Sequence, residues 1–579
     1  MNFNKINIKF IILIASITTL VYANSLKNSF VYDDSWVIIN NKFVKSLKNL
    51  PLVFSKKYLT ATKDIDFLGI YNDIGSGETT YRPIVTLTYF IDYHFWKLNA
   101  FGYHLLNLLL HIFNSILVYF LAASIAKEKK IALLASLLFA LHPVNSEAVN
   151  VISFREDLLV FLFFMSSLLF YIRLDNYTNP KKTFVYISSL ILFLLSLFSK
   201  EMAISLPIII ILYDYYYGKA APILNRFKSR YAGYFIVSTL YLLIWGLFIG
   251  NKNSPFKHMD YSFYKGIFTM SVTVMNYLQW LFIPTGIHAT INDHTLVFSA
   301  LTPKVIISIL LISICLIIAF KTFRRSRGTS FSIVWFFITL LPVTNIFLLN
   351  NIMASRYLYI PIFGFCLFLS ILLLKLSSVE PVRLCKLLAK YAIAVILIIY
   401  SMLAVMRNTV WRDNISLWSE IAKHYPNNAL AHSNLGLHFF ENNLFDSAIN
   451  EYSKALRLSP DAAAYYNGLG ACYYSKGMPD EAIVQYKKAL ILDPKALKAY
   501  NNLGLALNEK GMYKEAIECF QTIVRMDPQF LPAYNNLALV YIKMRRWEDA
   551  KRILKCAIEI DPHNEKTRDI LKEFIQFNY

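Results

Sequence analysis

Two adjacent carboxylates stand out among the residues whose types and spacing could do chemistry. Asp33 and Asp34 follow an apolar N-terminal stretch, in the run YDDSW. One carboxylate could take a proton from an attacking hydroxyl, while its neighbour raises its pKa or orients it. The alternative is a solvated turn, because aspartate is common in loops. Taken alone, the pattern leaves general-base chemistry and a plain turn both open.

Four cations recur between the later apolar runs and could bind a phosphate group. They are Arg82, Arg155, Lys200 and Arg356. Arginine suits this role because its planar guanidinium makes bidentate contacts with phosphate oxygens. Each cation could instead be a side chain that snorkels at a helix end, or one half of a structural ion pair.

Polar residues next to these cations are expected to support the same site. Glu201 follows Lys200, Tyr357 follows Arg356, and His142 and Glu147 belong to the run HPVNSE. His142 and Glu147 could also be metal ligands, but no third ligand has suitable spacing. We therefore predict no metal.

The overall composition indicates a membrane protein. Of 579 residues, 56% are hydrophobic and 16% are charged, against about 45–50% and 25% in soluble domains. Such a composition excludes a disordered chain, which needs few apolar residues. The net charge of +21 would raise nucleic-acid binding in a soluble protein. Here the cations cluster in short loops between apolar runs, as the positive-inside rule describes, so we expect membrane lipid and no nucleic acid as partner.

Eleven apolar runs are predicted to cross the membrane. They are 10–23, 105–126, 131–141, 158–172, 184–198, 202–217, 231–249, 305–320, 331–349, 359–374 and 391–406. The first could be a signal peptide, but no convincing cleavage site follows it. With eleven spans and a cytoplasmic N-terminus, the clusters of loop cations lie on the cytoplasmic side and the candidate residues lie on the outer side. Of two further runs, Gly266–Ile283 is expected to be an interfacial or re-entrant helix, and Arg82–Trp96 is expected to lie on the membrane rather than to cross it.

The C-terminal part repeats every 34 residues. Prolines stand at 426, 460, 494, 528 and 562, and Leu-Gly or Leu-Ala pairs and single alanines recur at the same period. This is the tetratricopeptide signature. We predict a membrane domain over 1–410, a linker over 411–426, four repeats over 427–562 and a capping helix over 563–579.

Asparagines share positions within these repeats. Asn467, Asn501 and Asn535 occupy one position, and Asn434 occupies the next, together with Asn502 and Asn536. On a concave repeat surface, side-chain amides could hold an extended peptide backbone. The alternative is an ordinary helix-pair surface. Either way, the repeats predict a protein or peptide partner.

The ordered set of motifs resembles the transmembrane and tetratricopeptide-repeat (TMTC) family. The motifs that carry this resemblance are Val31–Asp34, Tyr81–Pro83, Phe101–Asn107, His142–Val149 with Arg155 and Asp157, Ser199–Glu201 and Leu341–Tyr359, with the repeats after the last span. The family is similar to protein O-mannosyltransferases of the GT-C class. The resemblance implies a polyprenyl-phosphate sugar donor, a Ser or Thr acceptor and an acidic pair, here Asp33 and Asp34. Two features depart from the pattern: the repeats are few, and Asn145 stands where a second histidine or similar polar residue is expected. They leave the sugar and the acceptor open.

The predicted fold is therefore all-α: a GT-C-like polytopic bundle of about eleven spans, followed by a repeat α-solenoid. Asp33 and Asp34 are the expected catalytic residues, with Arg356, Arg155, Arg82 and Lys200 for the donor phosphate. The expected reaction is inverting transfer, with mannose as the expected sugar, and needs no cofactor besides the lipid-linked donor. A membrane-anchored scaffold and transfer to a glycolipid remain alternatives. A transporter is disfavoured, because few charges lie within the spans.

The composition, rich in lysine, isoleucine and asparagine, points to a bacterium. We therefore expect an integral protein of a bacterial inner membrane with the repeats in the periplasm. A eukaryotic relative would place the same face in the lumen of the endoplasmic reticulum.

Overall fold

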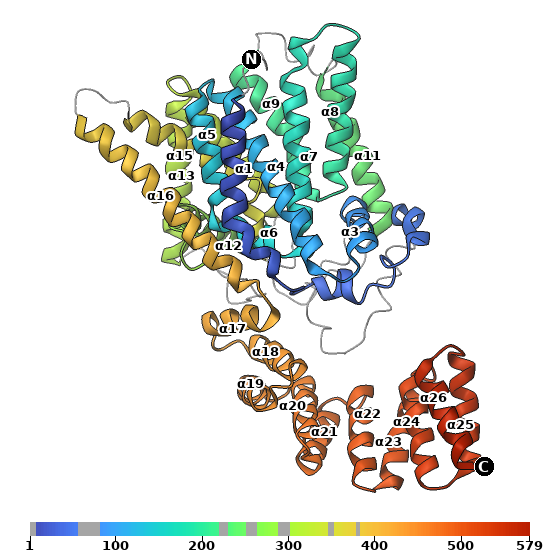
Figure 1. The fold of residues 1–579 in the computed structure, drawn as a ribbon. Helices are drawn as coiled ribbons and strands as arrows, with labels where there is room; N and C mark the ends of the chain where they lie inside the picture. Colours follow the sequence, from blue (N-terminus) through green and yellow to red (C-terminus); the bar gives the residue numbers. More distant parts are fainter. Residues whose placement is uncertain are drawn as a thin grey trace. The chain divides into compact units, whose positions relative to one another are not determined.

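The chain forms helices throughout the part that the structure describes. The computed structural model describes residues 7–55, 81–218, 230–249, 263–287, 302–344, 352–377 and 383–578, and no β-strand occurs in these ranges. The helices form two compact units, and the second begins at Trp418 (Figure 1). The predicted all-α class is confirmed.

The first unit contains the apolar helices. They are α1 (Ile8–Tyr22), α3 (Pro83–Trp96), α4 (Ala100–Ala126), α5 (Lys129–Leu141), α6 (Ser146–Asn150), α7 (Arg155–Ile172), α8 (Lys181–Leu197), α9 (Leu206–Tyr217), α11 (Ala232–Ile249), α12 (Phe263–Phe282), α13 (Pro303–Thr322), α14 (Arg327–Leu340), α15 (Ile362–Ser377) and α16 (Arg383–Val410). Short helical turns join several of them, among them η3 (Ser35–Ile39), η6 (Pro143–Asn145), η7 (Ile152–Phe154), η9 (Glu201–Ser205) and η14 (Ser355–Leu358).

The described helices differ in their ability to cross a membrane. By length and apolar composition, five of them can span a bilayer: 8–27, 100–126, 152–176, 303–322 and 390–410. A sixth is possible if α5 and the segment 143–150, bent by 48°, act as one broken span. Of the other predicted spans, 231–249, 331–349 and 359–374 carry shorter apolar helices, and part of the predicted span 331–349 lies outside the described residues. These helices indicate a membrane protein.

The centre of the first unit is built from α4, α5, α7 and α15. Helix α4 packs against α5 and α7, and α15 packs against α5 and α14. By contrast, α13 and α16 present apolar side chains outward, among them Leu310 and Met402, which are mostly exposed. An apolar face without a protein neighbour is the pattern expected of helices that face lipid, because a soluble helix keeps polar residues there.

The second unit is a stack of helix pairs with a final single helix. The pairs are α18 (Ala429–Glu441) with α19 (Phe445–Leu458), α20 (Ala463–Ser475) with α21 (Pro479–Leu492), α22 (Leu497–Glu509) with α23 (Tyr513–Met526) and α24 (Leu531–Lys543) with α25 (Trp547–Ile560), followed by α26 (Glu565–Asn578). Small residues let the paired helices approach closely: a Cβ at Gly470 would lie 2.6 Å from the Tyr486 ring. Helix α17 (Asn414–His424) lies within the segment expected as a linker.

Candidate functional site

Helix starts and short turns of the first unit carry the candidate side chains. Arg82 immediately precedes Pro83 at the start of α3, where proline fits because its missing N–H has no helical partner. Glu147 lies in the first turn of α6, and Glu156 and Asp157 lie in the first turn of α7. Carboxylates are favoured at these positions by the positive end of the helix dipole.

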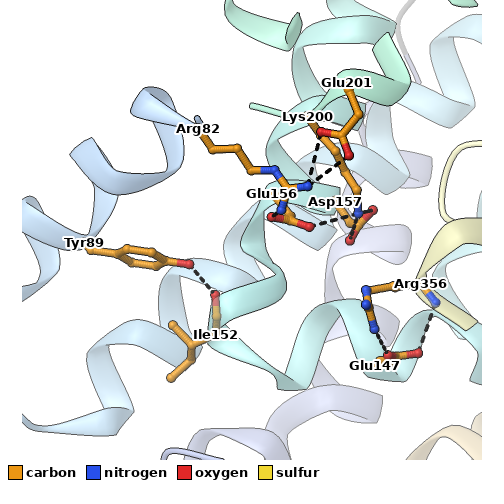
Figure 2. A network of polar contacts seen from close by, with 9 residues as sticks. All are labelled: Arg82, Tyr89, Glu147, Ile152, Glu156, Asp157, Lys200, Glu201 and Arg356. Carbon is orange, nitrogen blue, oxygen red and sulfur yellow. Dashed lines mark hydrogen bonds and ion pairs between the residues drawn. The ribbon is translucent and has the colours of Figure 1, made fainter. Parts of the chain in front are cut away.

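One network joins two cations to three carboxylates (Figure 2). Arg82 forms an ion pair with Glu156, and its Nη2 lies 3.0 and 3.2 Å from the two oxygens of Glu201. Lys200 Nζ donates to both oxygens of Asp157, at 2.7 and 2.8 Å, and lies 3.0 Å from Glu156. The side chains of Lys200 and Asp157 are only 2% and 1% exposed, so this pair is closed to solvent.

The charges in this network are stabilised by their partners. Burial lowers the pKa of Lys200, but the carboxylates of Asp157 and Glu156 outweigh burial, so the net pKa is raised. Burial raises the pKa of Glu201, but the charges of Arg82 and Lys200, together with hydrogen bonds to the carboxylate, outweigh burial, so the net pKa is lowered. Lys200 and Glu201 therefore both keep their charges near neutral pH.

A second pair lies beside this network and joins Glu147 to Arg356 (Figure 2). Arg356 Nη1 lies 2.6 Å from Glu147 Oε1, and the Arg356 backbone N–H donates to Oε2 at 3.1 Å. The Ser355 hydroxyl donates to the same Oε2. The guanidinium also stacks over the Phe154 ring, 3.9 Å from its centroid, which fixes its plane.

The two aspartates lie in different environments. Asp34 is fully buried, and its carboxylate accepts backbone N–H bonds from Val31 at 3.0 Å, Ser153 at 2.7 Å and Ile152 at 3.4 Å. Burial raises the pKa of Asp34 to about 6, although the backbone bonds oppose this shift. Asp34 thus fastens the loop to η7, an arrangement that leaves its oxygens occupied.

Asp33 is half-buried and follows Tyr32, whose ring lies 5.9 Å from that of Phe154 between centroids. Burial, and then the Asp33 carboxylate, raise the pKa of the Tyr32 phenol, while Arg356 lowers it. The charges of Asp33 and Arg356 therefore both act on this phenol. The Phe154 ring contacts both Tyr32, the residue before Asp33, and the Arg356 guanidinium that pairs with Glu147.

Arg155 lies apart from these groups. It is fully buried and binds Asp92 through Nη1 at 2.5 Å, with further bonds from Nε to Asn107 at 2.7 Å and from Nη2 to the Tyr103 carbonyl at 3.1 Å. A guanidinium enclosed in this way joins α3, α4 and α7. Its predicted role in phosphate binding therefore has no geometric support.

His142 and Glu147, which were weighed as metal ligands, are engaged with protein groups. His142 Nε2 lies 3.0 Å from the Leu281 carbonyl oxygen, and Nδ1 accepts from the Val144 N–H at 3.2 Å. These contacts assign the ring proton to Nε2. Within the described residues, no group of three His, Cys, Asp or Glu side chains is placed to hold a metal ion.

The repeat asparagines bond to one another between repeats. Asn502 Nδ2 donates to Asn467 at 3.1 Å, and Asn536 Nδ2 donates to Asn501 at 2.8 Å. Asn535 accepts from Thr567 at 3.0 Å, and Asn434 donates to the Leu430 carbonyl at 3.0 Å. Except for the bond of Asn434, which stays within α18, these side-chain bonds link successive repeats or the final helix, which is the structural alternative to peptide binding.

Glu156, like Asp157, received no catalytic or phosphate-binding role from sequence reasoning. It bridges Arg82 and Lys200, which are 118 positions apart in the chain. The acidic first turn of α7 was visible in the sequence, but its partners could not be identified before the helices were packed.

Known proteins similar to this chain fall into two groups. Tetratricopeptide-repeat family models match residues 411–463, 434–496, 497–530 and 531–564. Protein O-mannosyl-transferase F38B6.6 of Caenorhabditis elegans is 27% identical over 455 residues, which cover 76% of this chain and 61% of that protein. Protein O-mannosyl-transferase TMTC3 of Homo sapiens is 25% identical over 470 residues, which cover 76% and 50%. The chain thus matches between 50% and 61% of the length of these relatives.

Among solved structures, the crystal structure of MamA is similar to part of the chain. It is 26% identical and covers 26% of this chain and 86% of its own, with a TM-score of 0.25. The crystal structure of YrrB, a repeat protein with an unusual peptide-binding site, is 22% identical and covers 27% and 81%, also with a TM-score of 0.25. Scores this low carry no conclusion about this chain.

Proposed function

Starting from the resemblance to the TMTC family, which the relatives confirm, we propose that this chain is a membrane glycosyltransferase. It moves a sugar, with mannose as the first candidate, from a polyprenyl phosphate to a Ser or Thr hydroxyl of a protein on the outer face of the membrane. The observation that carries the proposal is that the Phe154 ring contacts both the Arg356 guanidinium, at 3.9 Å from its centroid, and the Tyr32 ring, at 5.9 Å between centroids, so that Asp33, the next residue, lies beside this cation. Such a site pairs a base with a cation for an anionic leaving group.

In the proposed reaction Asp33 is the general base. It accepts the proton of the acceptor hydroxyl as the oxygen attacks the anomeric carbon. A bond forms between this oxygen and the anomeric carbon, while the bond from that carbon to the phosphate oxygen breaks. The polyprenyl phosphate leaves with the bonding electrons, and this single displacement inverts the configuration. Asp34, with both oxygens bonded to the backbone, holds the loop that carries Asp33.

Arg356 and Arg82 are the proposed contacts for the donor phosphate. Their side chains are 10% and 15% exposed, whereas Lys200 is 2% exposed and Arg155 is fully enclosed. Among the described residues Arg82 Nε is buried and has no hydrogen-bond partner, so it can donate to a phosphate oxygen. Its partner Glu201 is 40% exposed and can move away. Lys200 then acts indirectly, by holding Glu156 and Asp157.

The repeats are proposed to bind the protein acceptor or a partner. A tether of this kind raises the local acceptor concentration to about millimolar when the linker is short. The proposal needs the repeats and Asp33 to face the same compartment. Cysteine labelling from each side of sealed vesicles tests this condition, and label at Asp33 and at the repeats from opposite sides would contradict it.

The activity test uses purified protein, radiolabelled polyprenyl-phosphate-mannose and a synthetic peptide rich in Thr and Ser. Labelled peptide, identified by mass spectrometry, is the expected result. Label found only in lipid would favour transfer to a glycolipid. No release of polyprenyl phosphate would favour a non-catalytic scaffold and would contradict the proposal.

A further inference from the structure

The end of α16 runs alongside the segment that leads to Asp33. Asn24 Nδ2 donates to the Val405 carbonyl at 3.0 Å, and Asn408 Nδ2 donates to Asn24 Oδ1 at 2.9 Å and to the Val21 carbonyl at 3.0 Å. Further along, the Ser29 N–H donates to the Arg412 carbonyl at 2.8 Å. Segments about 380 positions apart are thus fastened to each other at successive points.

A further bond between the same two segments lies next to the proposed base. The Tyr32 N–H donates to Asn414 Oδ1 at 2.9 Å. Although Asn414 begins α17, it does not cap this helix. Asp413 does so, because its Oδ1 accepts the Ser416 N–H at 2.7 Å and its carbonyl accepts the Leu417 N–H at 3.0 Å. The Asn414 side chain is therefore available for Tyr32.

Tyr32 needs such a partner because of its backbone conformation. Its φ is +55°, in the left-handed region that bulky residues rarely adopt. A residue stays there only where its surroundings hold it. The Asn414 bond holds the N–H, and the Phe154 ring, with its centroid 5.9 Å from that of Tyr32, holds the side chain. Asp33 is the next residue, so the orientation of Tyr32 determines where the Asp33 carboxylate lies.

We propose that Asn414 is a positioning residue for Asp33, an inference that rests on the proposed function. Asn414 touches neither the donor phosphate nor the acceptor; it acts through the backbone of Tyr32. Because α17 begins at Asn414, the same bond joins the helix that follows α16 to the loop that carries the base. The place of the Asn414 side-chain oxygen therefore sets the orientation of Tyr32 and, through it, of Asp33.

Three variants of the full chain separate this role from a structural one. Asn414→Ala removes the acceptor, Asn414→Asp keeps an oxygen at the same place, and Asp413→Ala removes the cap of the same helix while leaving the Tyr32 bond. Transfer from polyprenyl-phosphate-mannose to the synthetic peptide is measured as kcat and donor KM across pH, together with the thermal midpoint. Asn414→Ala should lower kcat about ten-fold with an unchanged donor KM, because one hydrogen bond is lost away from the cations.

The conservative variant provides the rescue. Asn414→Asp should retain kcat within about three-fold at the pH plateau. Its acid limb should move to higher pH, because an added negative charge near Asp33 raises the pKa of that carboxylate. Asp413→Ala should leave the pH profile and kcat as in the wild type and lower only the thermal midpoint.

The outcomes distinguish this inference from the proposed function. If Asp33→Asn is inactive while Asn414→Ala keeps wild-type kcat, the inference is overturned and the function stands. Equal losses of kcat in Asn414→Ala and Asp413→Ala would also overturn it, because disruption of the first turn of α17 would then explain both losses. A wild-type protein that transfers no sugar, or an Asp33→Asn variant with full transfer, would overturn the function and this inference together.

Discussion

Glu147 holds Arg356 with both carboxylate oxygens, although 209 positions separate them in the chain. One oxygen accepts from the guanidinium at 2.6 Å, and the other accepts from the Arg356 backbone N–H at 3.1 Å. Glu147 therefore fixes both the charge and the backbone of its partner. Burial lowers the pKa of Arg356, but Glu147, together with Tyr357 and Asp157, outweighs burial and the net pKa is raised, so the guanidinium stays charged at any working pH.

Glu147→Gln should reduce both stability and transfer. The amide keeps one acceptor oxygen but removes the negative charge, which leaves a mostly buried guanidinium uncompensated. Breaking one partner of a buried ion pair typically costs about 3–5 kcal/mol. The thermal midpoint of the purified protein should fall, and kcat/KM should fall with it, because Arg356 loses its orientation.

An exposed pair provides the matched control for Glu147→Gln. Lys572 and Asp569 lie 2.9 Å apart on α26, and both are mostly exposed. Lys572→Ala should change stability by no more than about 0.5 kcal/mol, because exposed pairs are weak. An equal midpoint for Glu147→Gln and wild type would show that the buried pair adds nothing.

Asp33→Asn and Asp34→Asn should fail in different ways. Asp33→Asn should lower kcat by at least about 10²-fold, the usual minimum for a general base, with an unchanged midpoint. Asp34→Asn places an NH₂ group against backbone N–H donors and should cost about 1–3 kcal/mol of stability. Kinetics and thermal unfolding of both variants check this, and unfolding of Asp33→Asn at a lower temperature than Asp34→Asn would reverse the assignment.

The wild type should lose part of its stability between about pH 4 and 6 because of Asp34. Its pKa is raised from 3.8 to about 6 by burial, so the unfolded chain releases this proton first as the pH rises. The contribution is fully present below pH 3.8, falls as the pH rises and levels off above the folded pKa. At 1.36 kcal/mol per pKa unit, the loss is of the order of 3 kcal/mol.

Asp34→Asn removes this titration and isolates it from other groups. The midpoint difference between wild type and Asp34→Asn, measured from pH 4 to 7, should shrink as the pH rises. A difference that is constant across this range would mean that Asp34 does not titrate there.

Asn536→Ala should weaken the stack of repeats. It removes the bond to Asn501 at 2.8 Å, and the net value of such a bond is about 0.5–1.5 kcal/mol. Thermal unfolding of the full chain measures the change. Asn427, which is exposed, is the matched control, and Asn427→Ala should leave the transition unchanged. A peptide-binding role without a structural one predicts equal midpoints for both variants.

The cations and carboxylates of the site show what residue patterns can foresee. Arg82, Lys200 and Arg356 were identifiable, because charged residues beside apolar runs are costly without a purpose. The partner of each was not identifiable. Glu156 bridges Arg82 and Lys200. Arg155 is enclosed by Asp92 and Asn107. Both arrangements arise only when the helices pack. Asp33 and Asp34 are equivalent neighbours in the sequence, and burial alone separates them.

The sequence by itself determined the all-helical class, the membrane unit, the period of the repeats and the chemical types available to the site. These follow from composition and from spacing along the chain, which local physical chemistry controls. Tertiary structure alone decided which carboxylate stays accessible, which cation is reachable and how the repeat asparagines pair. Those properties depend on groups that lie up to about 380 positions apart, as Tyr32 and Asn414 do, and only packing brings such groups together.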